Sequence, residues 1–287
     1  MEAVFKVTLL GTGSPIIDMN RFGNSTLVEV DGQKILFDVG RGALLRLSQL
    51  NILPGDIDKV FFTHLHSDHL TGFPDLWLTR LKATYNTRNE PMKIWGPKGT
   101  KQMAYFLENA FSADLNSRPH TESRHIQAHD IEEGVLYDEK GLKITAFLVD
   151  HGEIKPCYGY RLDFKGKSVL ISGDTRYNEN LIFHAENIDV LIHEVAAADL
   201  EQQDSDRYKR VLEIHTTPEE AGDIFSRVQP KLAVYTHVVL LGGMSEEEAR
   251  LVERTKKYFS GEVVVGKDLM AIVIGNDVKV MHSQEIT

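Results

Sequence analysis

Four residues of metal-ligand type stand within the short stretch 63–69: His64, His66, Asp68 and His69. In extended backbone, residues two positions apart face the same way, so the first pair, His64 and His66, can bind one ion together. The chain then turns toward a helix-like stretch, which directs the second pair, Asp68 and His69, at a point nearby. Metal sites need this density of ligands and polar turns do not, so the stretch predicts a metal site.

Three further residues of ligand type each follow an apolar strand: His151, Asp174 and His237. A single histidine at a strand end is as often a surface or capping residue as a ligand. Taken with the stretch 63–69, however, the three complete a larger pattern. We expect His151 to join the first pair, His237 to join the second pair, and Asp174 to bridge two ions through its two oxygens.

The composition limits the kind of metal site. The chain has 287 residues, of which 42% are hydrophobic and 26% charged, as in a globular protein with a large core. Its single cysteine, Cys157, excludes an internal disulfide and a thiolate-rich zinc site. The ligands are therefore nitrogen and oxygen atoms. They suit two Zn²⁺ ions, although Mn²⁺ and Fe²⁺ fit the same donors.

Hydropathy and charge indicate where the protein works and what it binds. No apolar run is long enough to cross a membrane, and the N-terminus begins with a strand-like alternation rather than a signal peptide. We expect a cytoplasmic protein with no membrane partner. The formal net charge of −10 repels phosphate backbones, which argues against tight binding of long nucleic acids.

Strand-like and helix-like stretches alternate along the whole chain. Strands are predicted at 3–10, 26–30, 34–39, 59–63, 92–95, 142–149, 158–164, 168–172, 189–194, 231–236, 262–265 and 270–274. Helices are predicted at 42–50, 70–82, 98–111, 178–186 and 245–259, and another begins at the capping box of Thr217 and Glu220. This mixture predicts an α/β (α+β) fold, in which helices cover the outer faces of sheets.

The motifs LGTGSP at 10–15 and HLHSDH at 64–69, together with His237, resemble those of the metallo-β-lactamase fold superfamily over essentially the whole chain. The resemblance implies a four-layer αββα sandwich with the two-metal site at one edge between the sheets. It implies one domain, residues 1–287, made of two similar halves, about 1–165 and 166–287. Asp38 matches a position that supports the site, although it could equally cap the helix near residue 42.

Two further motifs, HE at 193–194 and HTT at 215–217, are similar to those of the tRNase Z branch. In that branch a glutamate holds a histidine that acts on the scissile phosphate. The resemblance therefore implies catalytic roles for Glu194 and His215, beside Asp68. The alternative is that Glu194 ends a strand at the surface and that His215 merely precedes the cap of the next helix.

The chain departs from the tRNase Z branch between His151 and Asp174. Members that process tRNA carry there a long arm that grips the tRNA body, whereas this interval holds only a predicted hairpin. We therefore do not expect tRNA as the substrate. The stretch 72–79 is more similar to a subgroup that acts on smaller substrates and is described as phosphodiesterases and arylsulfatases.

Basic and aromatic residues follow the metal motif, in the stretch 77–90. They suit a cover over the site that holds an anionic aromatic ester, or else a solvated helix face. These residues are Trp77, Arg80, Lys82, Tyr85 and Arg88.

We expect a metal-dependent hydrolase in which a hydroxide that bridges two ions attacks a small phosphodiester. His215, oriented by Glu194, would donate a proton to the leaving oxygen. Alternatives are hydrolysis of aryl sulfates, lactones or β-lactams, trimming of tRNA 3′ ends, and metal binding without catalysis. A true β-lactamase is disfavoured, because Asp174 fills the bridging position and Cys157 lies elsewhere. The expected partners are a small anionic or ester substrate and a second copy in a homodimer.

Overall fold

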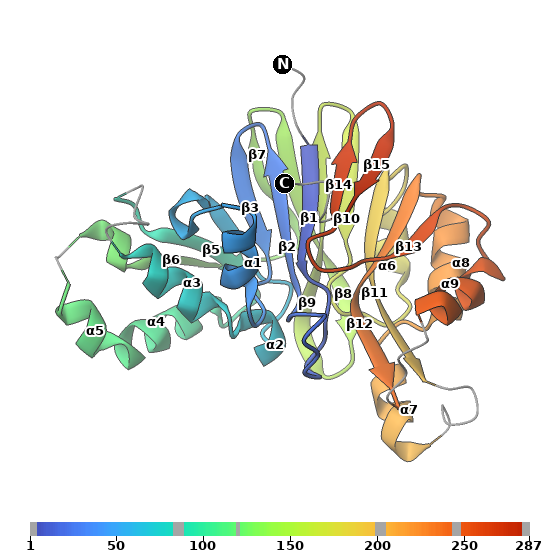
Figure 1. Ribbon diagram of the computed structural model, residues 1–287, viewed down its shortest axis with the longest axis horizontal. Helices are drawn as coiled ribbons and strands as arrows, with labels where there is room; N and C mark the ends of the chain where they lie inside the picture. Colours follow the sequence, from blue (N-terminus) through green and yellow to red (C-terminus); the bar gives the residue numbers. More distant parts are fainter. Residues whose placement is uncertain (1–4, 83–88, 119–120, 199–204, 243–247, 283–287) are drawn as a thin grey trace.

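Two β-sheets pack face to face in the computed structural model, which describes residues 5–82, 89–118, 121–198, 205–242 and 248–282 (Figure 1). In spatial order, the first sheet consists of β15 (Val278–Met281), β14 (Ala271–Ile274), β1 (Phe5–Gly11), β2 (Ser25–Val30), β3 (Gln33–Phe37), β4 (Lys59–Phe61), β5 (Met92–Gly96) and β6 (Ile126–Asp130). The second consists of β13 (Val263–Val265), β12 (Leu232–Leu241), β11 (Val190–Ala198), β10 (Lys167–Ile171), β9 (Ile154–Phe164), β8 (Leu142–His151) and β7 (Gly134–Glu139).

Helices cover the outer face of each sheet. The first sheet carries α1 (Ala43–Gln49), α3 (Phe73–Arg80) and α4 (Thr100–Ala110), and the second carries α6 (Glu179–His184), α8 (Pro218–Val228) and α9 (Glu248–Lys256). Three further helices are α2 (Ser67–Leu70), α5 (Ser112–Asn116) and α7 (Asp206–Leu212). The predicted four-layer αββα sandwich is confirmed. None of the described helices is long and apolar enough to span a membrane.

The largest apolar cluster lies between the two sheets, where inward side chains of both meet. The rings of Phe37 and Phe61, from the first sheet, lie 5.1 and 5.6 Å from the ring of Tyr160, from the second. The Tyr160 hydroxyl donates to the carbonyl oxygen of Phe62 at 2.7 Å, so this buried polar group is paired. The two sheets thus form one rigid support for the loops at their edges.

β11 is buried along its whole length, as is typical of a strand that is covered on both faces. Val190 and Ile192 point between the sheets, whereas Leu191 and Val195 pack against the helical layer. β11 pairs in parallel with β10 and β12, so the C-terminal ends of these three strands lie at the same edge of the sheet.

The capping box at the start of α8 is also confirmed. Thr217 accepts a hydrogen bond from the backbone N–H of Glu220, whose carboxylate accepts one from the backbone N–H of Thr217. The sequence pattern did not predict β6, β7, β15 or α7. β6 and β7 are the outermost strands of their sheets, and their half-exposed side chains obscure the apolar alternation.

The chain passes from the first sheet to the second between β6 and β7, and it returns to the first for β14 and β15. Residues from both ends of the sequence therefore build the first sheet. The division of the domain into two similar halves near residue 165 stays a prediction.

Candidate metal centre

One group of ligand-type atoms unites the loop after β4 with the end of β8 and the loop after β10. These atoms lie within 4.8 Å of one another and belong to His64, His66, His151 and Asp174. His151 is the last residue of β8. The group contains the residues that we expected around one ion.

A second group lies beside the first and contains Asp68, His69 and His237, again with ligand atoms within 4.8 Å. Asp68 and His69 are in α2, and His237 is in β12. The Oδ2 atom of Asp68 lies 3.1 Å from Nε2 of His237 and 3.5 Å from Nε2 of His69. This is the set that we expected around a second ion.

Asp174 stands between the two groups. Its Oδ2 atom lies 3.3 Å from Nε2 of His237 and 3.4 Å from Nε2 of His69, both in the second group. The same oxygen lies 3.8 Å from Nε2 of His64 and 3.9 Å from Nε2 of His151, both in the first group. The position agrees with the bridging role that the sequence predicts.

Asp38 fixes one histidine of each group through the ring nitrogen that faces away from the centre. It contacts His69 directly and His64 through Thr63. Nδ1 of His69 donates to Oδ2 of Asp38 at 2.7 Å. The Thr63 hydroxyl donates to the same oxygen at 2.8 Å and accepts from Nδ1 of His64 at 3.0 Å. With Nδ1 as donor, Nε2 of each ring keeps its lone pair toward the centre. Asp38 therefore supports the site, and α1 begins after Gly42 without a side-chain cap.

Three supporting residues were not found from the sequence. Nδ1 of His151 donates to the carbonyl oxygen of Ile214 at 2.9 Å. The Asn24 amide donates to Asp38 at 3.3 Å, and Thr63 links Asp38 to the first group as described above. These residues come from separate loops, and no spacing in the sequence marks them. Only the contact between the loops shows what they do.

Several buried atoms of the two groups have no hydrogen-bond partner among the described residues, notably Nε2 of His64, Nε2 of His69 and Oδ1 of Asp174. These side chains are almost completely buried. Unpaired buried polar atoms are rare because they cost stability. Divalent cations would pair all of them, and imidazole with carboxylate is a donor set that binds zinc, manganese and iron. The residues present therefore fit two metal ions.

The protonation states of the first group and of Asp174 agree with this fit. Burial lowers the pKa of His64, His66 and His151, which favours the neutral imidazoles that bind metals. Burial alone would raise the pKa of Asp174, but the neighbouring His237 and His69 hold it well below its usual range. Asp174 is thus an anion among nitrogen donors. In the second group, burial opposes protonation of His69, but Asp174 and Asp38 raise its pKa well above its usual range.

Two unusual backbone conformations direct Asp174 and His237 into the site. Gly173 has φ +63°, and a Cβ there would lie 2.6 Å from the carbonyl oxygen of Tyr158, so the turn before Asp174 requires glycine. His237 has φ +42°. β11 and β12 shift register across Glu194 and Val195, which leaves His237 as the extra residue of a β-bulge. Such a bulge redirects a side chain that a regular strand would place elsewhere.

Glu194 and His215 also lie together, beside the two groups. Nδ1 of His215 donates to Oε1 of Glu194 at 3.1 Å, and the backbone N–H groups of Thr175 and Thr216 donate to the same oxygen. A ligand atom of His215 lies within 4.8 Å of those of Asp174 and His237. Burial opposes protonation of His215, but Glu194 raises its pKa to about 9. Glu194 is buried, so it does not end a strand at the surface.

A cavity of about 250 Å³ opens above this cluster. Polar atoms of the cluster form its floor, and its walls are mostly apolar. The wall residues are Ser14, Pro15, Ile16, Val211, Ile214, Val239 and Leu241. A substrate would therefore bind with a polar group at the floor and an apolar group at the mouth.

Of the stretch 77–90, the structure describes residues 77–82 and 89–90, and the proposed cover over the site stays a prediction. Trp77 is fully buried in the core below α3, and Arg80 is buried with Nη1 donating to the carbonyl oxygen of Glu90. Neither residue belongs to a solvated helix face. Tyr85 and Arg88 lie outside the described residues.

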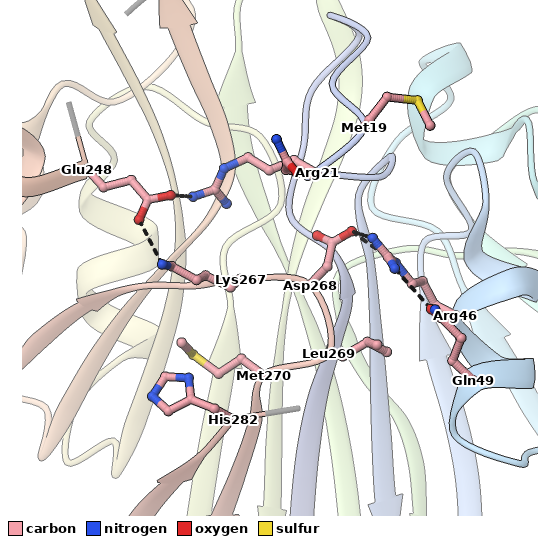
Figure 2. Close-up of a pocket in the computed structure, with 11 residues that line it drawn as sticks. Met19, Arg21, Arg46, Gln49, Glu248, Lys267, Asp268, Leu269, Met270 and His282 are labelled. Carbon is pink, nitrogen blue, oxygen red and sulfur yellow. Dashed lines mark hydrogen bonds and ion pairs between the residues drawn. The ribbon is translucent and has the colours of Figure 1, made fainter. Parts of the chain in front are cut away.

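A second cavity, the charged cavity, lies between α1 and the segment that precedes β14 (Figure 2). Its volume is about 730 Å³. The charged side chains are paired with one another: Arg46 with Asp268, and both Arg21 and Lys267 with Glu248. These ion pairs connect the loop after β1 and helix α1 to the C-terminal part of the chain.

Comparisons with known proteins agree with the fold. Residues 5–224 match the family model described as anti-Pycsar protein Apyc1. The chain is 34% identical to ribonuclease Z of Mycobacterium avium (strain 104) over 279 residues, which cover 94% of this chain and 99% of the relative.

Solved structures show the same architecture. The metallo-β-lactamase fold protein YhfI from Bacillus subtilis superposes with a TM-score of 0.76 at 21% identity, over 94% of this chain and 100% of that one. Human tRNase Z, short form, superposes with a TM-score of 0.70 at 25% identity, over 94% and 99%. The chain therefore belongs to the anti-Pycsar Apyc1 family and to the tRNase Z-like, metal-dependent hydrolases of the metallo-β-lactamase fold.

Proposed function

We propose that this hydrolase cleaves phosphodiester bonds with two metal ions held at the candidate metal centre. His64, His66 and His151 would hold one ion, and Asp68, His69 and His237 the other. Asp174, which lies between the two groups, would contact both. The observation that carries the proposal is the set of buried, inward-facing nitrogen and oxygen atoms without a protein partner among the described residues.

Zinc is the metal that we propose, because neutral imidazoles and carboxylates bind it well at neutral pH. Manganese and iron are the alternatives. When bound, two such ions lower the pKa of water, so that it becomes a nucleophile, and they neutralise charge that develops on phosphate oxygens.

The chain itself would supply the proton for the leaving group. His215 faces the cluster, and Glu194 fixes its ring through Nδ1, which leaves Nε2 to face the reacting phosphate. Because Glu194 raises the pKa of His215 to about 9, the imidazole is protonated at neutral pH. We therefore propose that His215 donates a proton to the leaving oxygen and that Glu194 orients it.

The proposed substrate is a small phosphodiester. The cavity above the cluster has a volume of about 250 Å³, which suits a phosphate with one attached group. The interval between His151 and Asp174 consists of the strands β9 and β10 and short turns.

Endonuclease activity on RNA is the second candidate, and the relatives favour it. The mycobacterial relative is named ribonuclease Z, and this chain covers 99% of its length. The aligned region therefore covers nearly the whole length of that relative. The short interval between His151 and Asp174 does not by itself exclude tRNA, and our sequence-based argument against tRNA is not supported.

Metal analysis and a substrate panel test the proposal. The panel contains a bis(nitrophenyl) phosphodiester, a nitrophenyl phosphomonoester, a nitrophenyl sulfate, a lactone, a β-lactam and a precursor tRNA. We expect two metal ions per chain and the highest kcat/KM for the phosphodiester. Specific cleavage of precursor tRNA at a higher kcat/KM would favour the second candidate. A protein that carries two ions and hydrolyses no phosphodiester would contradict both.

A homodimer and a cytoplasmic location are also proposed, as the sequence analysis expects. Light scattering of the purified protein would test the oligomeric state, and a measured monomer mass would contradict the dimer.

A further inference from the structure

We propose that His193 is a positioning residue, which holds the backbone of Glu194 and thereby aims its carboxylate at His215. This inference rests on the proposed function, because it concerns the pair that would deliver the proton. His193 lies outside both groups of the candidate metal centre and does not line the cavity above them.

His193 interrupts an apolar row. Leu191, Val195 and Ala197 point from β11 toward the helical layer and pack in its core. Since strand residues alternate between faces, His193 points the same way and is 0% exposed. Its ring lies 5.9 Å from the ring of Phe225, in α8. The pattern of the strand calls for an apolar residue at this position, so the imidazole needs another explanation.

The imidazole makes one hydrogen bond, to the backbone of the next residue. Nδ1 of His193 lies 2.7 Å from the carbonyl oxygen of Glu194. A carbonyl oxygen only accepts, so Nδ1 carries the proton and Nε2 is the unprotonated nitrogen. Nε2 has no hydrogen-bond partner within the part of the chain that the structure describes. The buried ring is thus kept despite an unpaired atom, which costs stability.

The carbonyl oxygen of Glu194 lies beyond the point at which β11 separates from β10. β10 ends at Ile171, and the last pairing between the two strands joins Ile171 to Ile192. Beyond that point, the backbone of Glu194 on the side that β10 has left is held by side chains. Its N–H donates to the Ser172 hydroxyl at 3.0 Å, and its carbonyl accepts from His193. On the other side of β11, the register shifts between Glu194 and Val195.

Hydrogen bonds with side chains thus replace the backbone hydrogen bonds of the sheet at Glu194, the residue whose carboxylate must point at His215. The Glu194 carboxylate reaches His215 at 3.1 Å from the inner face of β11, while the His193 ring secures the same residue from the outer face. A rotation of the Glu194 peptide would move the carboxylate away from His215. The hydrogen bond from His193 opposes that rotation.

Three variants of the metal-loaded protein separate positioning from packing. In His193→Asn, the amide nitrogen takes the place of Nδ1 and can still donate to Glu194. In His193→Leu, the apolar row is completed and the donor is lost. Phe225→Leu is the packing control, because it disturbs the contact with the His193 ring and leaves the hydrogen bond in place.

We expect His193→Leu to lower kcat about 10-fold, with unchanged KM and metal content, and His193→Asn to recover most of the loss. Phe225→Leu should keep the native kcat, whatever it does to stability. Equal kcat in His193→Leu and the native protein would overturn the inference. So would equal losses in all three variants, because packing alone would then explain them.

A measurement without turnover keeps the inference separate from the proposed function. Long-range ¹H–¹⁵N NMR of the zinc-loaded native protein should show His193 as the Nδ1–H tautomer, with a slowly exchanging Nδ1 proton. An Nε2–H tautomer would overturn the inference even in an active enzyme. If the native protein hydrolyses no phosphodiester, the proposed function fails, and the tautomer still tests the bond to Glu194.

Discussion

The candidate metal centre and the charged cavity both gather charged side chains from distant parts of the chain, but they pair them differently. In the charged cavity, the Asp268 carboxylate accepts hydrogen bonds from the backbone N–H groups of Thr12 and Phe22, from the Thr12 hydroxyl and from the Arg46 guanidinium. In the metal centre, Nε2 of His64 and other inward atoms have no partner among the described residues.

The difference distinguishes a structural cluster from a binding site. Where every charge is neutralised by a neighbour, as around Asp268, the side chains hold loops together and a ligand would have to break existing pairs. Where buried donors and acceptors converge without partners, a bound ion removes the free-energy cost of leaving them unpaired. The larger cavity is therefore not the better candidate for the active site. Five substitutions test the contrast, from the largest expected effect to the smallest.

Asp174→Ala should abolish phosphodiester turnover and lower the metal content. It removes the carboxylate that lies between both groups and leaves the surrounding histidines without their shared anion. Metal analysis of the purified variant, together with kcat/KM, measures the effect. An Asp174→Ala protein with full metal content and full rate would refute the two-metal assignment.

His215→Ala should lower kcat by about 10²–10⁴-fold and leave the metal content unchanged, because His215 is proposed to move a proton. The pH profile gives an independent readout. Glu194 raises the pKa of His215 to about 9, so the protonated form prevails below that pH and is lost as the pH rises through it.

We therefore expect the rate to fall above about pH 9, and this alkaline limb to move to lower pH in Glu194→Gln. The His215–Glu194 pair stabilises the fold in the same sense. Its contribution is complete below the usual pKa of histidine and disappears as the pH rises through the folded-state value. An alkaline limb that does not move in Glu194→Gln would assign it to another group.

Asp268→Ala should destabilise the fold by about 3 kcal/mol, because it leaves the largely buried Arg46 without its partner. The side chain of Asp268 is 4% exposed, and the pair joins residues from opposite ends of the chain. Urea unfolding measures the loss. The folded variant should keep the native metal content per chain. A selective loss of metal without a loss of stability would contradict the contrast between the two regions.

Lys267→Ala should have the smallest effect, below about 1 kcal/mol in unfolding free energy, with the native kcat. Lys267 and Glu248 lie 3.5 Å apart, with side chains 63% and 41% exposed, and solvent screens such a pair. The same urea titration measures it. A large loss of stability would mean that this exposed pair stabilises the fold more than the buried pair of Arg46 and Asp268 does.

The types of residue in the metal centre could be predicted from the sequence because they stand in short motifs at the ends of apolar strands. The stretch 63–69 carries four of them, and His151, Asp174 and His237 each follow a recognisable strand. Parallel strands and their loops end at a common edge, so local pattern was enough to place them together. The αββα layers followed in the same way from the alternation of strands and helices.

Only the tertiary structure decided how those residues are held and what surrounds them. The β-bulge that turns His237 inward depends on the register between β11 and β12, and the bond from Asp38 to His69 joins residues on separate loops. Trp77 lies in the core because α3 packs that face on the first sheet. Such contacts join side chains that are far apart in the chain, whereas a sequence pattern shows only how residues close together in the chain are arranged.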